Sequence, residues 1–153
     1  MINKKQIYKK AYALLSKRDY SVAVMRKKLF DFAYTDSGNE FSEIVIDNII
    51  DDLKEKNWLS DERVVSTYLY SKGNLYGEKR IRIELKKIGI DDQIIEKILQ
   101  TFEFCDYEKA KTLLGKKFKG HATSMKEKVK RRDYLMRRGF SCGISNKLVL
   151  RDN

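Results

Sequence analysis

The side chains best able to do chemistry in this sequence are basic, and they gather in its last third. Residues 107–153 hold 14 Lys and Arg against 4 Asp and Glu, which gives +10 of the net charge of +11. Residues 1–43 hold 9 against 5, and residues 44–106 hold 10 against 13. A solvated surface alone could carry basic residues for solubility. So lopsided a distribution favours contact with a polyanion, either nucleic acid or a nucleoprotein surface.

Eight basic side chains are the best candidates for this contact. They close one expected helix or lie along the next one: Lys116, Lys117, Lys119, Lys126, Lys130, Arg131, Arg137 and Arg138. The lysines at 116–117 and the arginines at 137–138 also have a structural explanation that needs no partner, because cations at a helix C-terminus interact favourably with the helix dipole. A patch of about four to six such charges on phosphates would give binding that falls steeply with salt, because counterions are released.

Other constellations give weaker signals. His121, the only histidine, lies in the polar stretch KGHATS without a carboxylate or cysteine at metal spacing, so we expect a surface loop residue. The GKK at 115–117 lacks the first glycine and the Ser or Thr of a phosphate-binding loop. Cys105 and Cys142 form no CxxC, and we expect both to be reduced and half-buried. The sequence therefore predicts no catalytic residue, no metal and no cofactor.

The elements that must position the basic residues are helices. Apolar residues recur at steps of three and four throughout, and the chain has no proline. The pattern predicts an all-α protein with helices over 5–17, 21–32, 42–56, 61–73, 77–88, 92–102, 107–118, 124–138 and 142–150. We also expect three helix N-caps, at Ser60, at Asp106 and at Ser124, the last with Glu127 in a capping box.

The nine helices fall into three sets of three. LKKIGIDDQIIEKIL (85–99) aligns with LMRRGFSCGISNKLV (135–149) at a constant offset of 50, so that Gly89 meets Gly139. Gly139 can adopt the left-handed conformation that ends a helix, Phe140 can turn inward, and Ser141 can cap the next helix. We predict a tandem array of three three-helix repeats, elongated and curved, over residues 1–58, 59–105 and 106–153, with the basic repeat last.

These residues resemble the RecX family of regulatory proteins. The stretch LSDERVVSTYLYSKGNLYGEKRIRIELKKIGID (59–91) is similar to the central repeat of that family. ALLSKRDYSVAVMRKKL (13–29) resembles its first repeat, and YLMRRGFSCGISNKL (134–148) its last. The resemblance implies a modulator that lies in the groove of the RecA filament on single-stranded DNA. It also implies inhibition of RecA ATPase, strand exchange and co-protease activity without an enzymatic activity of its own.

Two alternatives of other classes stay open on the sequence alone. Three-helix repeats with a short turn before the third helix are compatible with an autonomous helix-turn-helix-like DNA-binding protein, although residues 92–102 contain only Lys97 as a basic residue. The second alternative is a helical scaffold that binds some other, acidic protein and uses its charge only to steer the encounter.

No apolar run approaches the roughly 18 residues of a membrane span, and no export signal is evident. We therefore expect a cytoplasmic monomer that binds free DNA weakly.

Overall fold

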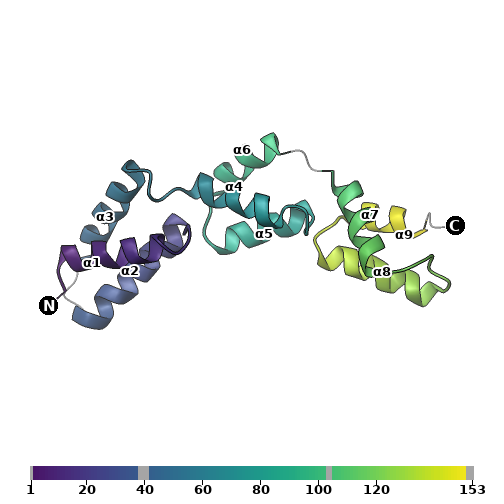
Figure 1. The fold of residues 1–153 in the computed structure, drawn as a ribbon, viewed down its shortest axis with the longest axis horizontal. Helices are drawn as coiled ribbons and strands as arrows, with labels where there is room; N and C mark the ends of the chain where they lie inside the picture. Colours follow the sequence, from purple (N-terminus) through teal and green to yellow (C-terminus); the bar gives the residue numbers. More distant parts are fainter. Residues whose placement is uncertain (1, 38–41, 103–104, 151–153) are drawn as a thin grey trace. The chain divides into compact units, whose positions relative to one another are not determined.

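The computed structural model describes residues 2–37, 42–102 and 105–150, and every regular element in these ranges is an α-helix (Figure 1). The helices are α1 Lys4–Leu15, α2 Val22–Ser37, α3 Glu43–Glu55, α4 Asp61–Lys72, α5 Glu78–Lys87, α6 Asp92–Thr101, α7 Asp106–Lys117, α8 Met125–Arg137 and α9 Cys142–Leu150. Each expected segment corresponds to one helix, so the all-α prediction is confirmed.

The extent of α2 differs most from the prediction. The sequence placed its end near residue 32, whereas the helix continues to Ser37. Ala33 is buried, and the ring of Tyr34 stacks on Phe30 with a centroid separation of 6.1 Å. No glycine or proline interrupts residues 32–37, so nothing stops the helix before Gly38. Residues 33–37, which the sequence placed after the end of this helix, are therefore helical.

Contacts divide the chain into two compact units, which we describe separately. The first comprises Met1–Ser66 with Lys86–Glu96, and the second comprises Thr67–Leu85 with Lys97–Asn153. This division passes through the predicted middle repeat, 59–105. The boundaries of the three repeats therefore remain a prediction from the sequence.

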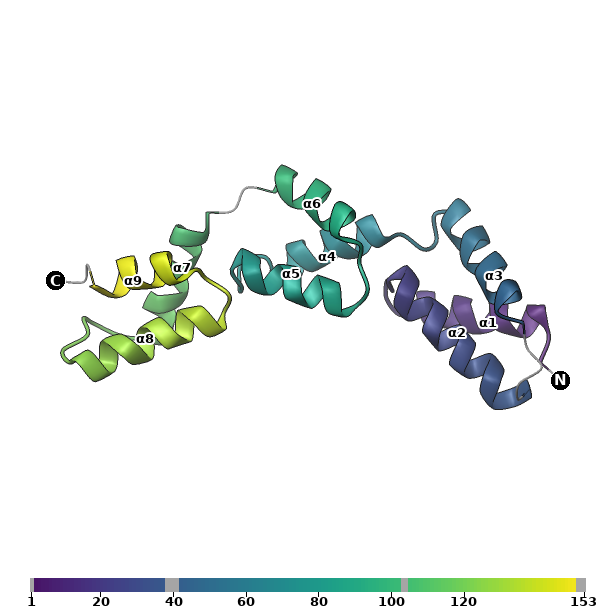
Figure 2. The same cartoon turned by 180° about the vertical axis from the view of Figure 1, so that it is seen from behind.

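Each unit contains a packed set of three helices. In the first unit α1, α2 and α3 pack against one another (Figure 1). Their core contains the fully buried side chains of Met25, Leu29, Ile49 and Leu53. In the second unit α7, α8 and α9 pack around Leu114, Leu135, Phe140 and Leu148, and Figure 2 shows α8 beside α9. Met25 and Leu29 come from one face of α2, and Ile49 and Leu53 from one face of α3, as the apolar spacing requires.

The joint between α8 and α9 has the geometry that the sequence predicted. Gly139 has φ of 90°. The N–H groups of Gly139 and Phe140 donate to the carbonyls of Met136 and Leu135 at 3.0 and 3.2 Å, which is the Schellman motif. Phe140 is buried, and the hydroxyl of Ser141 accepts from the N–H of Ile144 at 3.2 Å. The turn therefore ends α8 and starts α9.

The start of α5 docks on this joint. The N–H of Gly77 donates to the carbonyl of Arg138 at 2.8 Å, and a Cβ at Gly77 would lie 2.4 Å from the carbonyl oxygen of Gly139. The carboxylate of Asp106 accepts from the N–H of Glu78 at 3.3 Å. The prediction that Asp106 caps its own helix is therefore wrong: it is the first residue of α7, and it caps α5 instead.

The first unit contains an equivalent joint. The Ser21 hydroxyl, at the start of α2, donates to the carbonyl of Ile88, and the Asp61 carboxylate accepts from the N–H of Val22 at 2.8 Å. Ser21 lies 56 residues before Gly77, and Ile88 lies 50 residues before Arg138. Gly89, with φ of 79°, follows Ile88 as Gly139 follows Arg138. The internal similarity of the sequence thus recurs as a shared way of docking one helix on the next turn.

Candidate nucleic-acid interface

The eight predicted basic residues lie on α7, on α8 and between them, all in the second unit. Six of the side chains are exposed: Lys116, Lys117, Lys119, Lys126, Lys130 and Arg137. Among the residues that the structure describes, none of these six is paired with a carboxylate. We call these six residues the basic surface. Unpaired and hydrated cations of this kind are available to phosphate or carboxylate groups of a partner.

The N-terminal cap of α8 fixes where two of these cations lie. The Ser124 hydroxyl accepts from the N–H of Glu127 at 3.2 Å, as predicted. The Glu127 carboxylate does not return to Ser124 but accepts from the N–H and hydroxyl of Thr123, at 2.7 and 3.1 Å. These hydrogen bonds, the one from the Thr123 N–H first, hold the pKa of Glu127 below its ordinary value of 4.5. The capped first turn presents Lys126 and Lys130 one turn apart on the exposed face of α8.

Arg131 does not belong to the basic surface, and its predicted contact role needs correction. It is 6% exposed, and its Nη1 donates to the carbonyl of Gly120 at 2.8 Å. Its guanidinium lies 5.2 Å from the ring centroid of Phe118. Arg131 therefore holds the turn between α7 and α8 onto the helix bundle. A charged group committed to such contacts is not available to a partner.

Arg138 belongs mainly to the joint, whereas Arg137 does not. Arg138 is half-buried, and its Nη1 donates to the carbonyl of Leu75 at 3.3 Å. Its guanidinium lies 5.5 and 5.4 Å from the ring centroids of Tyr76 and Tyr134. The Arg137 side chain stays in solvent, and only its carbonyl is engaged by Arg80, at 3.1 Å. Adjacent arginines thus have different roles, because successive residues of a helix point in different directions.

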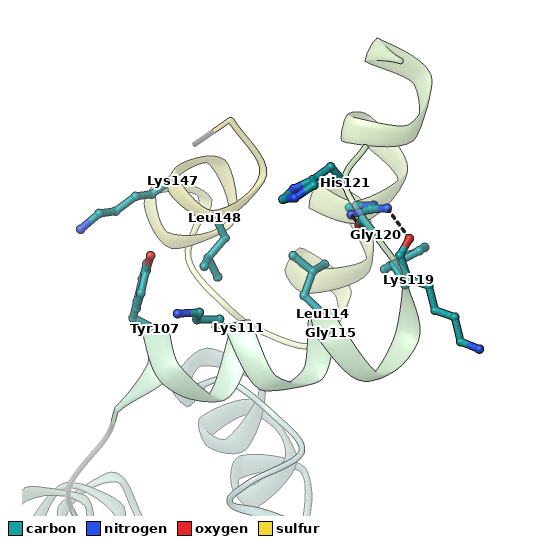
Figure 3. A pocket seen from close by; sticks show the side chains of 11 residues that line it. Tyr107, Lys111, Leu114, Gly115, Lys119, Gly120, His121, Lys147 and Leu148 are labelled. Atoms are coloured by element: carbon teal, nitrogen blue, oxygen red, sulfur yellow. Dashed lines mark hydrogen bonds between the residues drawn. The ribbon is translucent and has the colours of Figure 1, made fainter. Parts of the chain in front are cut away.

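An open pocket between α7 and α9 adds residues that the sequence analysis missed (Figure 3). Its volume is about 620 Å³. Its lining comprises Tyr107, Lys111, Leu114, Gly115, Phe118, Lys119, Gly120, His121, Arg131, Lys147 and Leu148. This lining holds four Lys or Arg residues, His121 and no acidic residue. The pocket and the basic surface share Lys119.

The missed residues carried a signal in the sequence. Tyr107, Lys111 and Gly115 recur at steps of four and therefore share one face of α7. Lys147 is the only basic residue of α9, and its ammonium lies 5.0 Å from the ring centroid of Tyr107. The pairing of that face with α9 follows from tertiary packing, which the helical period does not specify.

The remaining candidate groups have plain surroundings. Cys105 and Cys142 are free, but both are exposed, so the expectation of half-burial is wrong. Residues 115–117 form the last turn of α7. Over 2–37, 42–102 and 105–150, no group of three His, Cys, Asp or Glu side chains is arranged to hold a metal ion. In the same ranges, no helix combines the length and apolar character needed to cross a membrane.

Comparison with known proteins gives consistent matches over most of the chain. A family model of the third three-helix domain of RecX matches residues 105–149. The regulatory protein RecX of Haemophilus influenzae is 36% identical over 131 residues, which cover 83% of this chain and 82% of that protein. The regulatory protein RecX of Neisseria gonorrhoeae is 31% identical over 136 residues, or 89% and 84% of the two chains.

A solved structure shares the fold. The crystal structure of RecX from Lactobacillus salivarius superimposes with a TM-score of 0.76 and 25% sequence identity. The superposition covers 96% of this chain and 94% of that one. The pocket and all the predicted basic residues fall inside residues 105–149, the part that the family model matches.

Proposed function

Because this chain belongs to the RecX family of regulatory proteins, we propose that it binds the RecA filament on single-stranded DNA and restrains RecA activity. The observation that carries the proposal is the basic surface, six exposed cations on α7, on α8 and in the turn between them. A filament of protein on DNA presents a repeating polyanion, and unpaired cations give it a salt-dependent affinity. Filament binding without chemistry would restrain ATPase, strand exchange and co-protease activity by obstructing growth or favouring disassembly.

The repeated joints support contact with a polymer. A chain that contains an equivalent joint in each of its two units offers a related surface in each, and a filament offers related surfaces on successive protomers. Several modest contacts on one chain then combine, because each later contact forms at high effective concentration. Affinity for the filament would exceed affinity for an isolated RecA monomer or for a short DNA strand.

The direct test is the single-stranded-DNA-dependent ATPase of RecA. Protein added below the RecA concentration should lower the rate, and it should co-sediment with filaments. An unchanged rate, with no protein in the filament pellet, would refute the proposal. Raising the salt concentration should weaken co-sedimentation steeply.

A charge-reversal variant ties the effect to the basic surface. Lys126, Lys130 and Arg137 are changed to Glu together, and the control changes three exposed lysines of the first unit, Lys5, Lys9 and Lys27. Both variants change the net charge equally, so a general effect of charge would weaken them alike. We expect the first variant to lose most inhibition while the control keeps it. Equal loss would show a general effect of charge and would refute a specific contact at the basic surface.

Sequence-specific duplex binding is less well supported. The third helix of a DNA-reading module must present side chains to base edges. α6 and α9 each contain one lysine and no arginine. A gel-shift series against salt separates the two functions, since base-specific duplex binding would persist at high salt.

A further inference from the structure

The pocket between α7 and α9 has the dimensions and walls of a ligand site. Its volume of about 620 Å³ lies within the range of ordinary small-molecule sites. Figure 3 shows Leu148 of α9 pointing toward α7 between Tyr107 and Lys111 on one side and His121 on the other, with Lys147 at the rim and its side chain directed outward. The pocket belongs to one packed set of helices, so its shape depends only on α7, α8, α9 and the turn at 118–121.

The charge of the pocket favours an anion. Its lining contains no carboxylate, whereas Lys111, Lys119 and Lys147 are exposed there. The guanidinium of Arg131 already bonds to the Gly120 carbonyl, so the lysines carry the available charge. The Lys111 ammonium has no hydrogen bond or ion pair within the described part of the chain. An isolated cluster of cations around a concave surface attracts phosphate or carboxylate groups.

The apolar part of the pocket distinguishes among anions. Leu114 and Leu148 are buried beneath it, and Tyr107 stands at its edge with Lys147 at 5.0 Å from its ring centroid. A bare phosphate or an acidic peptide would leave this apolar surface unused. A nucleotide would use both parts, since its base stacks on aromatic and apolar side chains while its phosphate meets cations.

We propose that this pocket binds one nucleotide of single-stranded DNA, with the phosphate at Lys111 and Lys147 and the base against Tyr107 and Leu148. This proposal rests on the proposed function and adds a defined subsite to it. The basic surface would then follow the neighbouring phosphates of the strand, since Lys119 belongs to both. The contact is sequence-tolerant, because every base presents a flat apolar face.

Gly115 gives this proposal a selective test. It lines the pocket from within α7, and a Cβ added there would meet nothing within 4 Å. Gly115→Ala should therefore leave the pocket open. Gly115→Gln adds a long uncharged side chain in the same place and should obstruct the pocket. Both residues favour a helix more than glycine does, so neither variant should unfold α7.

The experiment measures binding of a fluorescent oligo(dT) to the full chain by anisotropy, without RecA. Lys111→Gln with Lys147→Gln is compared with Lys5→Gln and Lys9→Gln, two exposed lysines of α1 whose replacement changes the net charge equally. We expect the pocket pair to weaken binding about ten-fold, and to lower the salt slope by about 0.7 for each phosphate that a lysine no longer neutralises. The α1 pair should bind within about two-fold of the wild type, because neither lysine lines the pocket. Gly115→Gln should weaken binding, whereas Gly115→Ala should not.

The proposal is overturned by no binding of oligo(dT) to the wild type, by equal weakening in both lysine pairs, or by equal binding of the two Gly115 variants. Displacement of the oligonucleotide by a poly-Glu peptide of matched charge, as effectively as by unlabelled oligo(dT), would also overturn it and assign the pocket to acidic peptides. RecA ATPase measured with the same wild-type protein keeps the two proposals apart. Inhibition that persists without oligo(dT) binding refutes the subsite alone, and absence of inhibition refutes the proposed function.

Discussion

Replacing Arg131 by alanine separates a structural arginine from a partner-binding one. The sequence grouped Arg131 with its exposed neighbours, whereas the structure buries it to 6% exposure under the turn that joins α7 to α8. The substitution removes the hydrogen bond and the ring stacking that hold this turn. We therefore expect a decrease in stability rather than a direct decrease in affinity.

The magnitude follows from two interactions. The bond from Nη1 to the Gly120 carbonyl, 2.8 Å long, involves a charged donor, and such bonds contribute about 1.5–3 kcal/mol. The guanidinium over the Phe118 ring adds about 0.5–1 kcal/mol. The approach to the Lys119 carbonyl, at 3.5 Å, lies at the limit of hydrogen bonding and adds little. The expected destabilisation is about 2–4 kcal/mol, which for a chain of this size lowers Tm by about 4–16 °C.

Thermal unfolding followed by circular dichroism measures this destabilisation, and co-sedimentation with filaments measures binding below the transition. Arg137→Ala is the matched control, because its side chain lies in solvent, and its Tm should stay within about 1 °C of the wild type. Arg131→Lys keeps the charge and one donor and should fall between the wild type and alanine. An Arg131→Ala protein that melts like the wild type but no longer binds filaments would show that Arg131 contacts the partner, and the structural account would be wrong.

Three further substitutions test the elements around the site. Gly139→Ala should destabilise the protein by at least about 2 kcal/mol in thermal unfolding, because φ is 90° and the new Cβ would lie 2.6 Å from the Arg80 nitrogen. Gly115→Ala should raise the free energy of unfolding by about 0.5–1 kcal/mol, since it is helical and has open space around it. The pKa of Glu127 is lower in the folded protein than in the unfolded chain. The hydrogen bonds from Thr123 to the Glu127 carboxylate therefore stabilise the fold above the unfolded pKa, and this stabilisation is lost as the pH falls through the folded pKa. Glu127→Gln should therefore flatten the acid side of a Tm against pH curve, and an unchanged curve would contradict the role of Thr123 as its donor.

The fold was predictable because its signals are local. Apolar spacing set the helices, and the glycine at each turn set where they end, as the φ values of Gly89 and Gly139 bear out. The extension of α2 was missed because a polar stretch such as residues 34–37 can be helix or loop, and packing of Ala33 and Tyr34 decides between them. Local preference is weak where tertiary contacts compete with it.

The candidate site was only partly predictable because charge alone does not report burial. The sequence identified the region and six exposed cations within it. It could not distinguish Arg131 from Lys130, because adjacent helix residues face different surroundings. It also missed the pocket, since Lys111 and Lys147 are 36 residues apart and meet only when α7 packs on α9. A basic side chain becomes a binding group or a structural group according to which carbonyls and rings lie near it.

The two joints use different chemistry for one geometry. In the first unit the Ser21 hydroxyl donates to the turn, whereas in the second unit the main-chain N–H of Gly77 does so. In each unit the docked helix is capped by an aspartate that begins a later helix, Asp61 in the first and Asp106 in the second. What recurs is the position of the donor and of the capping carboxylate, whereas the chemical group that donates differs between the two joints. The joint of the second unit involves residues 77–80, 106 and 138–139, and none of them lines the pocket. Docking and ligand binding therefore occupy separate residues of the second unit, and each can be altered while the other is left intact.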